Sequence, residues 1–314
     1  MELIRTRLPH RSTTRDAVVV IGNFDGLHLG HRALIDRMHS LAKPLELVPS
    51  LMCFEPLPAT VFDPSNPVLR LMSVRDKIIE TRRLGIQRLL MRPFNRAFAS
   101  LSPEAFVSEV IVRQARACHV IVGEDFRFGA SARGDVDLLI HLGSSHGFEV
   151  HPVGAVEYFG ERISSTRLRD RLAQGDLETA EQMLGRPYAM SGRVLRGQQL
   201  GRELDFPTVN IRPPMPPALS GIFAVRVTAD DPAGPQNHPG VASLGLRPTV
   251  GGKEWLLEVH LFDYDGALYG QHLSVEFKSF IRHEKKFESL DVMVEHMHRD
   301  AAKARADLSA PSHQ

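Results

Sequence analysis

Residues 17–38 read AVVVIGNFDGLHLGHRALIDRM, and the order of residue types in this segment sets the architecture of the first half of the chain. Five apolar residues predict a buried strand, the glycines at 22, 26 and 30 predict a loop, and a helical pattern follows. A helix N-terminus behind a glycine loop favours an anion, because its backbone N–H groups are unpaired. The spacing fits neither G-x-G-x-x-G nor G-x-x-x-x-G-K-[ST], so neither a dinucleotide fingerprint nor a Walker loop is predicted.

Two histidines stand at the mouth of the predicted helix, His28 and His31. Both can donate hydrogen bonds to a phosphate whose charge the helix N-terminus already favours, an arrangement that suits an α-phosphate under attack. Two alternatives stay open at this point. In the first, the glycines only permit a tight turn and the histidines are surface residues of that turn. In the second, the histidines bind a metal, although the sequence shows no third ligand.

The pattern around this segment extends over more than half of the chain. From Ala17 to about Leu184, short apolar runs alternate with helix-like segments, which predicts βαβ units on a parallel sheet. The last helical pattern begins near Thr166 and ends at Gly185, just before Pro187.

The pattern of residue types changes after Tyr188. Runs of β-branched and aromatic residues between glycines and prolines predict an antiparallel sandwich or barrel, with one amphipathic helix over about 290–306 on its outside. We therefore predict two domains, 1–185 and 186–308, followed by a frayed tail at 309–314.

Composition narrows the class of protein. The chain has 314 residues, about twice the ~150 of a typical domain. Its 38 Lys and Arg against 37 Asp and Glu give a net charge of +1, so we expect no nucleic-acid or membrane partner.

Cys53 and Cys118 lie in apolar runs and are expected to be reduced core residues. No secretory signal and no membrane-spanning run is evident, so we expect a cytoplasmic protein; the sequence gives no oligomeric state.

A second polar segment, ISSTRLRDRL, begins at Ile163. Its hydroxyls, including Ser164 and Thr166, lie at a predicted helix start, and Arg167 and Arg169 can neutralise a pyrophosphate leaving group. A plain N-cap is the alternative.

A third segment, GEDFRFG at 123–129, directly follows a predicted strand. Read alone, it places Phe126 and Phe128 in the core and Asp125 in a solvated turn.

Five motifs, GNFDGLHLGH, GEDFRFG, ISSTRLR, FPTVN and the LEVHLFD…LYG…IRHE series, occur in an order that resembles the prokaryotic bifunctional riboflavin kinase/FAD synthetases over nearly the whole chain. The resemblance implies an α/β parallel-sheet, Rossmann-like H-x-G-H nucleotidylyltransferase domain followed by a mostly antiparallel β-barrel riboflavin kinase domain. It implies that riboflavin and ATP give FMN, that FMN and ATP give FAD and pyrophosphate, and that Mg²⁺ takes part.

The resemblance also assigns roles to residues. His28, His31 and Arg169 act on the ATP phosphates of the transferase, and Glu258 is the base of the kinase. The other residues that it assigns to the transferase nucleotide and flavin are Gly22, Asn23, Phe24, Asp25, Gly30, Asp125, Phe126, Ser164 and Thr166. Those that it assigns to the kinase are Thr208 and Asn210 at the Mg-ATP site, with Thr208 on the metal, Arg282 on the flavin side, and a mobile nucleotide loop of Gly192, Arg193, Gly197, Gly201 and Arg202.

The kinase assignments make chemical sense, because phosphoryl transfer needs mainly alignment and charge stabilisation. Pro207 stiffens the segment, while Thr208 and Asn210 face one side if the strand is extended. Alternation in EWLLEVHLFD sends Glu258 to the face opposite Leu257, and we expect that face to be the barrel lumen. There Glu258 could accept the proton of the riboflavin 5′-hydroxyl. A solvent-facing strand carboxylate is the alternative.

Three positions depart from the family pattern. Leu57 stands where the family often has a histidine between two prolines, and the usual G-F-P-T-A-N is changed by Asp205 and Val209. Three functions are thus compared: the two-step enzyme, another transferase such as a cytidylyl or pantetheine adenylyl enzyme, and a flavin-binding protein in which only the adenylyltransferase half is active. The FPTVN barrel argues against the second of these.

Overall fold

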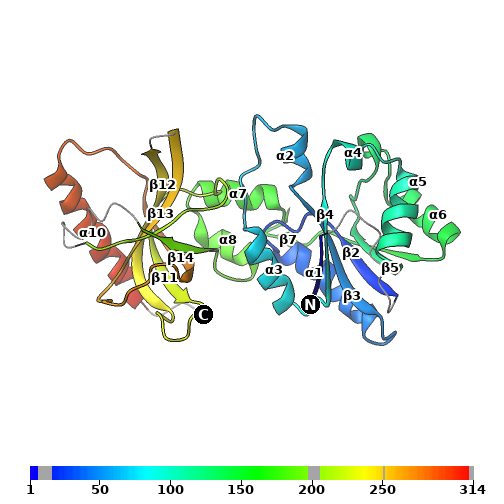
Figure 1. Ribbon diagram of the computed structural model, residues 1–314, viewed down its shortest axis with the longest axis horizontal. Helices are drawn as coiled ribbons and strands as arrows, with labels where there is room; N and C mark the ends of the chain where they lie inside the picture. The colour runs from blue at the N-terminus through cyan, green and yellow to red at the C-terminus, as the bar shows by residue number, and fades with distance from the viewer. Residues whose placement is uncertain (6–15, 197–205, 250–251, 311–314) are drawn as a thin grey trace. The chain divides into compact units, whose positions relative to one another are not determined.

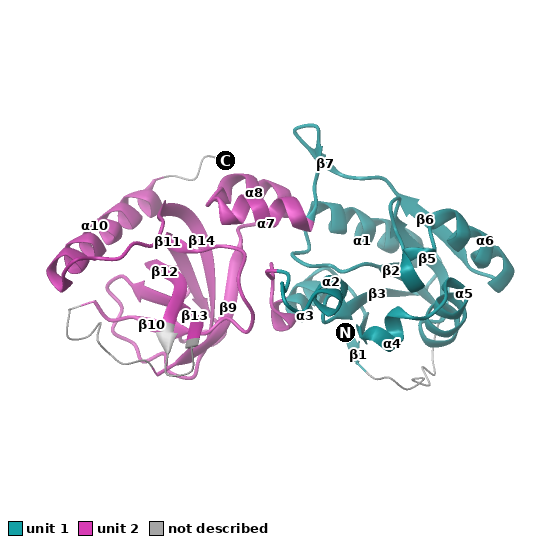
Figure 2. Ribbon diagram, turned by 90° about the horizontal axis from the view of Figure 1, so that it is seen from above, with its two compact units in different colours: residues 1–68, 77–164 teal, residues 69–76, 165–314 magenta. Residues whose placement is uncertain are grey.

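The computed structural model describes residues 1–5, 16–196, 206–249 and 252–310. Contacts between Cα atoms divide the chain into two compact units (Figure 2). Unit 1 comprises residues 1–68 and 77–164, and unit 2 comprises residues 69–76 and 165–314. The short segment 69–76 therefore leaves unit 1 to join unit 2, and the chain then returns.

Unit 1 is built on the predicted parallel sheet. Its six strands lie in the order β1-β4-β3-β2-β5-β6, and every neighbouring pair is parallel. The strands are β1 (Glu2–Ile4), β2 (Ala17–Ile21), β3 (Val48–Glu55), β4 (Arg88–Pro93), β5 (Ala117–Gly123) and β6 (Glu149–Val153). All five residues of β2 are buried, as expected for a strand with both faces covered.

Helices supply the cover on the two faces of the sheet. Val19 and Ile21 of β2 belong to the core cluster that Val107 of the π-helix η1 and Leu139 of α6 complete. The opposite face carries Val18 and Val20, next to α1. The remaining elements of this half are α1 (Leu29–Ala42), α2 (Pro58–Phe62), α3 (Val74–Arg83), α4 (Arg96–Ala99), α5 (Pro103–Ala105), η1 (Phe106–Gln114), η2 (Ala130–Ala132), α6 (Val136–His146), β7 (Glu157–Tyr158) and β8 (Glu161–Arg162).

Unit 2 contains a closed barrel in the order β10-β13-β12-β11-β14-β9, and all neighbours are antiparallel, which confirms the predicted class (Figure 1). The strands are β9 (Ala189–Leu195), β10 (Val209–Ile211), β11 (Gly221–Ala229), β12 (His238–Thr249), β13 (Gly252–Leu261) and β14 (His272–Arg282). Inward residues such as Phe223 and Phe277 meet edge to face with ring centroids 5.1 Å apart. The last helix, α10 (Leu290–Ser309), packs Ala304 against the outside of the barrel, as predicted, and runs three residues further.

Two helices stand where one helical pattern was predicted after Thr166. These are α7 (Ser165–Ala173) and α8 (Leu177–Leu184), separated at Gly175, whose φ of +75° favours glycine. Asp176 then caps α8 by accepting a hydrogen bond from the N–H of Thr179 at 3.1 Å. The second helix ends at Gly185, where the sequence placed the stop.

The segment 69–76 is fastened to the rest of unit 2. The N–H of Arg70 donates to the carbonyl of Pro216 at 3.0 Å, and Arg75 forms an ion pair with Asp230 at 2.6 Å. The hydroxyl of Ser191, on β9, donates to Asp76. None of the helices in the described ranges is both long and apolar enough to cross a bilayer.

Candidate active sites

The first candidate site lies where the strand order of the parallel sheet reverses. The chain passes from β2 to β3 and β4 on one side and then returns to β5 on the other side of β2. Ligands of open parallel sheets bind at the carboxyl ends of the strands at such a reversal. The two loops that leave these strand ends are 22–28 and 124–129, which carry two of the motifs found in the sequence.

The loop after β2 is tightly built. The N–H of Gly22 donates to the carbonyl of Met52 at 3.1 Å, and Phe24, Asp25 and Leu27 are buried. Phe24 and Leu27 both have φ of +48°, a left-handed conformation that residues with a side chain adopt at a cost. Strain of this kind persists only where the surroundings impose it, so the loop is held in one shape.

The two histidines of the motif stack on each other, with ring centroids 3.7 Å apart. His28 is the N-cap of α1, and its Nδ1 accepts a hydrogen bond from the N–H of His31 at 3.3 Å. The accepting Nδ1 therefore carries no hydrogen. Gly30 lies between them in the first turn of the helix.

His31 has a different environment. Burial lowers its pKa well below the ordinary range, and electrostatic interactions with His28 and Lys77 lower it further. The imidazole is therefore neutral at pH 7. Its Nδ1 is buried and has no hydrogen-bond partner in the described part of the chain. Within those same ranges no third His, Cys, Asp or Glu donor gathers with the two histidines, so the structure gives the metal alternative no support.

Lys77 is a member of this site that sequence reasoning missed. Its side chain is fully buried, and its Nζ donates to the carbonyl of Asn23 at 3.0 Å and lies 4.0 Å from Oε2 of Glu55. An ammonium group behind the loop adds positive potential for a phosphate. No local signal could have found it, because Lys77 stands 54 positions from Asn23 on a helix with a mostly polar sequence. Asn23 itself is exposed.

The loop after β5 places its aromatic and acidic residues differently. Phe128 is buried, and Phe126 is half-buried and stacks on it with centroids 5.7 Å apart. Asp125 is exposed, and both its carboxylate oxygens accept from Arg162, at 2.7 and 2.8 Å. This hydrogen bonding lowers the pKa of Asp125. Asp125 thus lies in a solvated turn and Phe128 in the core, as their residue types predict. The role of Asp125 and Phe126 toward the flavin stays a prediction.

The ISSTRLR motif spans the division between the two units. Ser164 closes unit 1, whereas Thr166 and Arg169 lie on α7 in unit 2. Thr166 is exposed, and Nε of Arg169 donates to the carbonyl of Leu69 at 2.7 Å. Leu57, the departure from the family pattern, is 4% exposed just ahead of α2 and is a core residue.

The second candidate site is a cavity of about 360 Å³ on the outside of the barrel, beside α10. Thr208 and Glu258 both line it, together with Arg282. Much of its wall is apolar, which suits a flat ring system with polar groups at its edge. The apolar and aromatic lining residues are Phe206, Ile222, Val241, Ala242, Phe287, Met293 and Met297.

The FPTVN segment is fixed at the mouth of this cavity. Phe206 stacks on His260 with centroids 3.8 Å apart, and Nδ1 of His260 lies 2.8 Å from the carbonyl of Pro207. Asn210 stands directly opposite Glu258 in the antiparallel pairing of β10 with β13. Its Oδ1 is buried and has no hydrogen-bond partner among the described residues. The structure thus brings the proposed metal site and the proposed base together.

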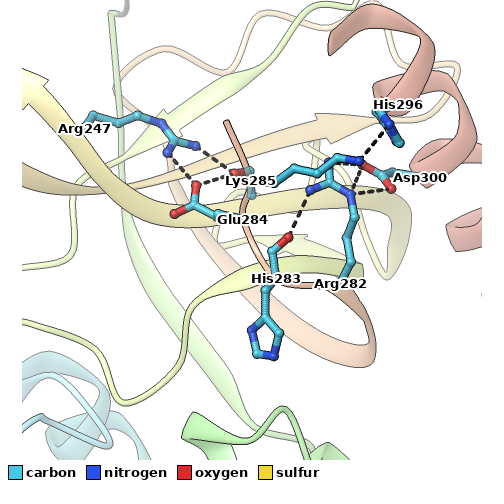
Figure 3. Close-up of polar contacts among 8 residues, drawn as sticks. Arg247, Arg282, His283, Glu284, Lys285, His296 and Asp300 are labelled. Carbon is cyan, nitrogen blue, oxygen red and sulfur yellow. Dashed lines mark hydrogen bonds and ion pairs between the residues drawn. The ribbon is translucent and has the colours of Figure 1, made fainter. Parts of the chain in front are cut away.

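The expected direction of Glu258 is wrong. Leu257 and Val259 fill the interior of the barrel and are fully buried, so Glu258 points outward, into the cavity beside α10. There its Oε2 accepts from Nε of Arg247 at 2.9 Å. Arg247 also binds Glu284, as Figure 3 shows. Burial alone would lower the pKa of Arg247, but the hydrogen bonds and charges of the two glutamates raise it.

Arg282 is held by other protein groups in this cavity (Figure 3). Its guanidinium donates to Asp300 of α10, with Nε at 3.0 Å and Nη2 at 2.6 Å, and also to the carbonyl of His283 at 3.0 Å. The pair joins β14 to α10, so Arg282 shapes the cavity by positioning its wall. Direct contact with the flavin stays a prediction.

The predicted mobile nucleotide loop is wrong at its first two positions. Gly192 and Arg193 belong to β9 rather than to a loop. A side chain at Gly192 would lie 2.4 Å from Cγ2 of Ile211, so close packing against β10 requires glycine there. Gly197, Gly201 and Arg202, together with Asp205, lie outside the described residues, whereas Val209 begins β10.

Comparisons with known proteins agree with this division of the chain. The FAD synthetase family model matches residues 10–167, and the riboflavin kinase family model matches residues 184–308. The bifunctional riboflavin kinase/FMN adenylyltransferase of Pseudomonas fluorescens is 40% identical over 316 residues, which cover 99% of each chain. The protein of the same name from Escherichia coli K12 is 40% identical over 290 residues, covering 92% of this chain and 91% of its own.

A solved structure supports the fold along nearly the full length. The crystal structure described as a macrolide-efflux protein from Streptococcus pneumoniae is 27% identical, with a TM-score of 0.83. The match covers 97% of this chain and 99% of that one. With both family models in tandem and full-length relatives of one description, the chain belongs to the bifunctional riboflavin kinase/FMN adenylyltransferase family.

Proposed function

We propose that this chain makes FAD from riboflavin in two steps, each at its own site and each using ATP. Riboflavin and ATP give FMN and ADP in the barrel, and FMN and ATP give FAD and pyrophosphate beside the parallel sheet. The observation that carries the proposal is the presence of two candidate sites in two units, each matched by its own family model. We also propose catalytic domains at 1–185 and 186–308, cytoplasmic residence, and no nucleic-acid or membrane partner, given the net charge of +1.

In the transferase, a phosphate oxygen of FMN attacks the α-phosphorus of ATP, and the bond to the oxygen bridging to the β-phosphorus breaks. His28 contacts the α-phosphate, and the neutral His31 donates its one N–H to it, at the positive end of α1. The positive charge of Lys77, which lies behind the loop at 3.0 Å from the carbonyl of Asn23, favours the negative charge of the phosphates. We assign Ser164, Thr166 and Arg169 to the pyrophosphate that leaves.

In the kinase, Glu258 accepts the proton of the riboflavin 5′-hydroxyl as that oxygen attacks the γ-phosphorus and ADP leaves. Arg247 holds the carboxylate in place at 2.9 Å. The oxygens of Thr208 and Asn210 fit Mg²⁺, since Oδ1 of Asn210 is buried without a hydrogen-bond partner in the described ranges and oxygen is the ligand this ion prefers. Bound there, Mg²⁺ would neutralise charge on the ATP phosphates.

The test is to incubate the purified full chain with riboflavin and Mg-ATP and to separate the flavins by chromatography. Glu258→Gln should slow FMN formation but leave the conversion of supplied FMN to FAD unchanged, and His31→Asn should do the reverse. Each loss should be on the order of 10²–10³ in kcat. Glu254→Gln is the matched control, because Glu254 lies on the same strand and pairs with Arg212 outside the cavity.

Two outcomes would count against the proposal. If an active preparation forms neither FMN nor FAD, the two-step function is rejected. If the protein adenylates supplied FMN but never phosphorylates riboflavin, the chain is a flavin-binding protein with only the transferase half active.

A further inference from the structure

Three metal-ligating side chains gather in unit 1, on elements other than the loop after β2. They are His119 on β5 and Glu149 and His151 on β6, which is the edge strand of the sheet (Figure 2). Nδ1 of His119 lies 3.1 Å from Nε2 of His151. Oε2 of Glu149 lies 3.6 Å from the first of these nitrogens and 3.7 Å from the second. Neither proposed catalytic step uses any of the three residues.

The three distances lie within about 0.2 Å of those between ligands of one tetrahedral zinc ion. Zinc binds imidazole nitrogen and carboxylate oxygen at about 2.0–2.2 Å, so neighbouring ligands of a tetrahedral ion lie roughly 3.3–3.5 Å apart. The point equidistant from the three observed atoms lies about 2.0 Å from each, by the geometry of a triangle with these sides. An ion could therefore bind all three atoms with little movement.

The sheet itself fixes this arrangement. In the parallel register, His119 stands beside Glu149, and His151 follows two residues later on the same face of β6. The imidazoles are well covered, with 14% and 17% of their side chains exposed, whereas Glu149 is 72% exposed. The open side leaves room for a water molecule as the fourth ligand.

A hydrogen bond between the two imidazoles is the competing explanation of their 3.1 Å contact. Arg37 of α1 favours that explanation, because its Nη2 lies 3.5 Å from Nδ1 of His151. A guanidinium only donates, so this contact needs an unprotonated Nδ1, whereas a metal on Nε2 needs the hydrogen on Nδ1. The contact is at the outer limit of hydrogen-bond length and Arg37 is exposed, so its side chain can move away.

We propose that His119, Glu149 and His151 form a binding site for a divalent transition-metal ion of the Zn²⁺ type, which links β5 to β6. Two imidazoles and one carboxylate suit zinc, whereas the Mg²⁺ of phosphoryl transfer prefers oxygen ligands. The site is therefore distinct in its chemistry from both nucleotide sites. Arg37 opposes loading through its charge and through the hydrogen-bond pattern that it imposes on His151.

The experiment titrates Zn²⁺ into the chelator-treated full chain against a chromophoric chelator. The wild type should bind one more equivalent than His119→Asn or His151→Asn, and each loss should exceed the roughly 10–100-fold in affinity that removing an outer partner of a metal ligand costs. His146→Asn, an exposed histidine at the end of α6, is the matched control and should bind like the wild type. Arg37→Gln should bind more tightly than the wild type.

Further readouts keep the test decisive. Co²⁺ added to the wild type should give the strong visible absorption of a tetrahedral site, which needs no variant to fold, and excess Mg²⁺ should not remove it. Adenylation of FMN by the variants is the control for folding. The proposal is overturned if the folded variants bind as many equivalents of Zn²⁺ as the wild type, or if Co²⁺ gives no tetrahedral spectrum.

Discussion

Replacing Lys77 by methionine tests whether the buried ammonium behind the nucleotide loop supports adenylyl transfer. The side chain is fully buried, and its 3.0 Å hydrogen bond to the carbonyl of Asn23 is made by a charged donor. Methionine has a similar length and fills the same space, so the substitution removes the charge and the hydrogen bond while it conserves packing.

The expected size of the effect follows from this contact. A hydrogen bond to a charged group contributes about 1.5–3 kcal/mol, which corresponds to roughly a 10- to 150-fold change in rate if the loop geometry is needed in the transition state. The loss of a positive charge near His31 should also raise the pKa of that imidazole toward its ordinary value of 6.5.

The assay measures FAD formation from supplied FMN and, in the same preparation, FMN formation from riboflavin. Lys77→Met should slow the first reaction by the factor given above and leave the second unchanged, because the kinase residues belong to unit 2. Lys43→Met, at the exposed C-cap of α1, is the matched control. A Lys77→Met protein with wild-type adenylation would refute the role assigned to this lysine.

Three further predictions concern stability. Phe223→Ala should lower the free energy of unfolding of the barrel by about 3–5 kcal/mol, because Phe223 is fully buried, whereas Leu246→Ala, at a side chain 44% exposed, should cost far less; denaturant titration compares them. Arg282→Gln leaves the carboxylate of Asp300, 9% exposed, without its ion partner and should lower the free energy of unfolding by about 3–5 kcal/mol. An equal loss in Arg282→Lys would show that bidentate geometry matters as well as charge. The pKa of His31 in the folded state lies below the ordinary 6.5, so below pH 6.5 the unfolded chain binds more protons than the folded chain. The contribution of His31 to stability is therefore full above pH 6.5 and is lost as the pH falls. His31→Asn should flatten this dependence when the free energy of unfolding is measured against pH.

Sequence patterns within short segments were sufficient to predict the helices and strands whose formation depends on neighbouring residues. The segment 17–38 predicts strand, loop and helix because burial on both faces, glycine spacing and helical periodicity are all encoded within one short run. The β-branched runs between turn residues predicted antiparallel strands in the same way, and the resemblance to the family decided between a sandwich and a barrel. The break at Gly175 was missed because apolar positions continue at helical spacing across it.

Features that depend on distant residues could not be predicted. Alternation in β13 separates Glu258 from Leu257 but does not tell which face becomes the interior; that depends on how the barrel closes. Arg247 reaches Glu258 across neighbouring strands, and Lys77 reaches Asn23 across 54 positions, so no short motif announces either contact.

The excursion of residues 69–76 into unit 2 bears on whether the two activities can be separated by cutting the gene. A fragment that starts at residue 186 keeps every barrel strand but lacks Arg75 and Asp76, the partners of Asp230 and Ser191. A fragment that stops at residue 185 keeps the bond from Arg169 to Leu69 but lacks Pro216, Asp230 and Ser191, the other partners of the excursion. Three passages of the chain between units, rather than one linker, make this protein harder to split than two matched family models in tandem suggest. A working kinase fragment would need the excursion supplied again, for instance by joining it to the new N-terminus.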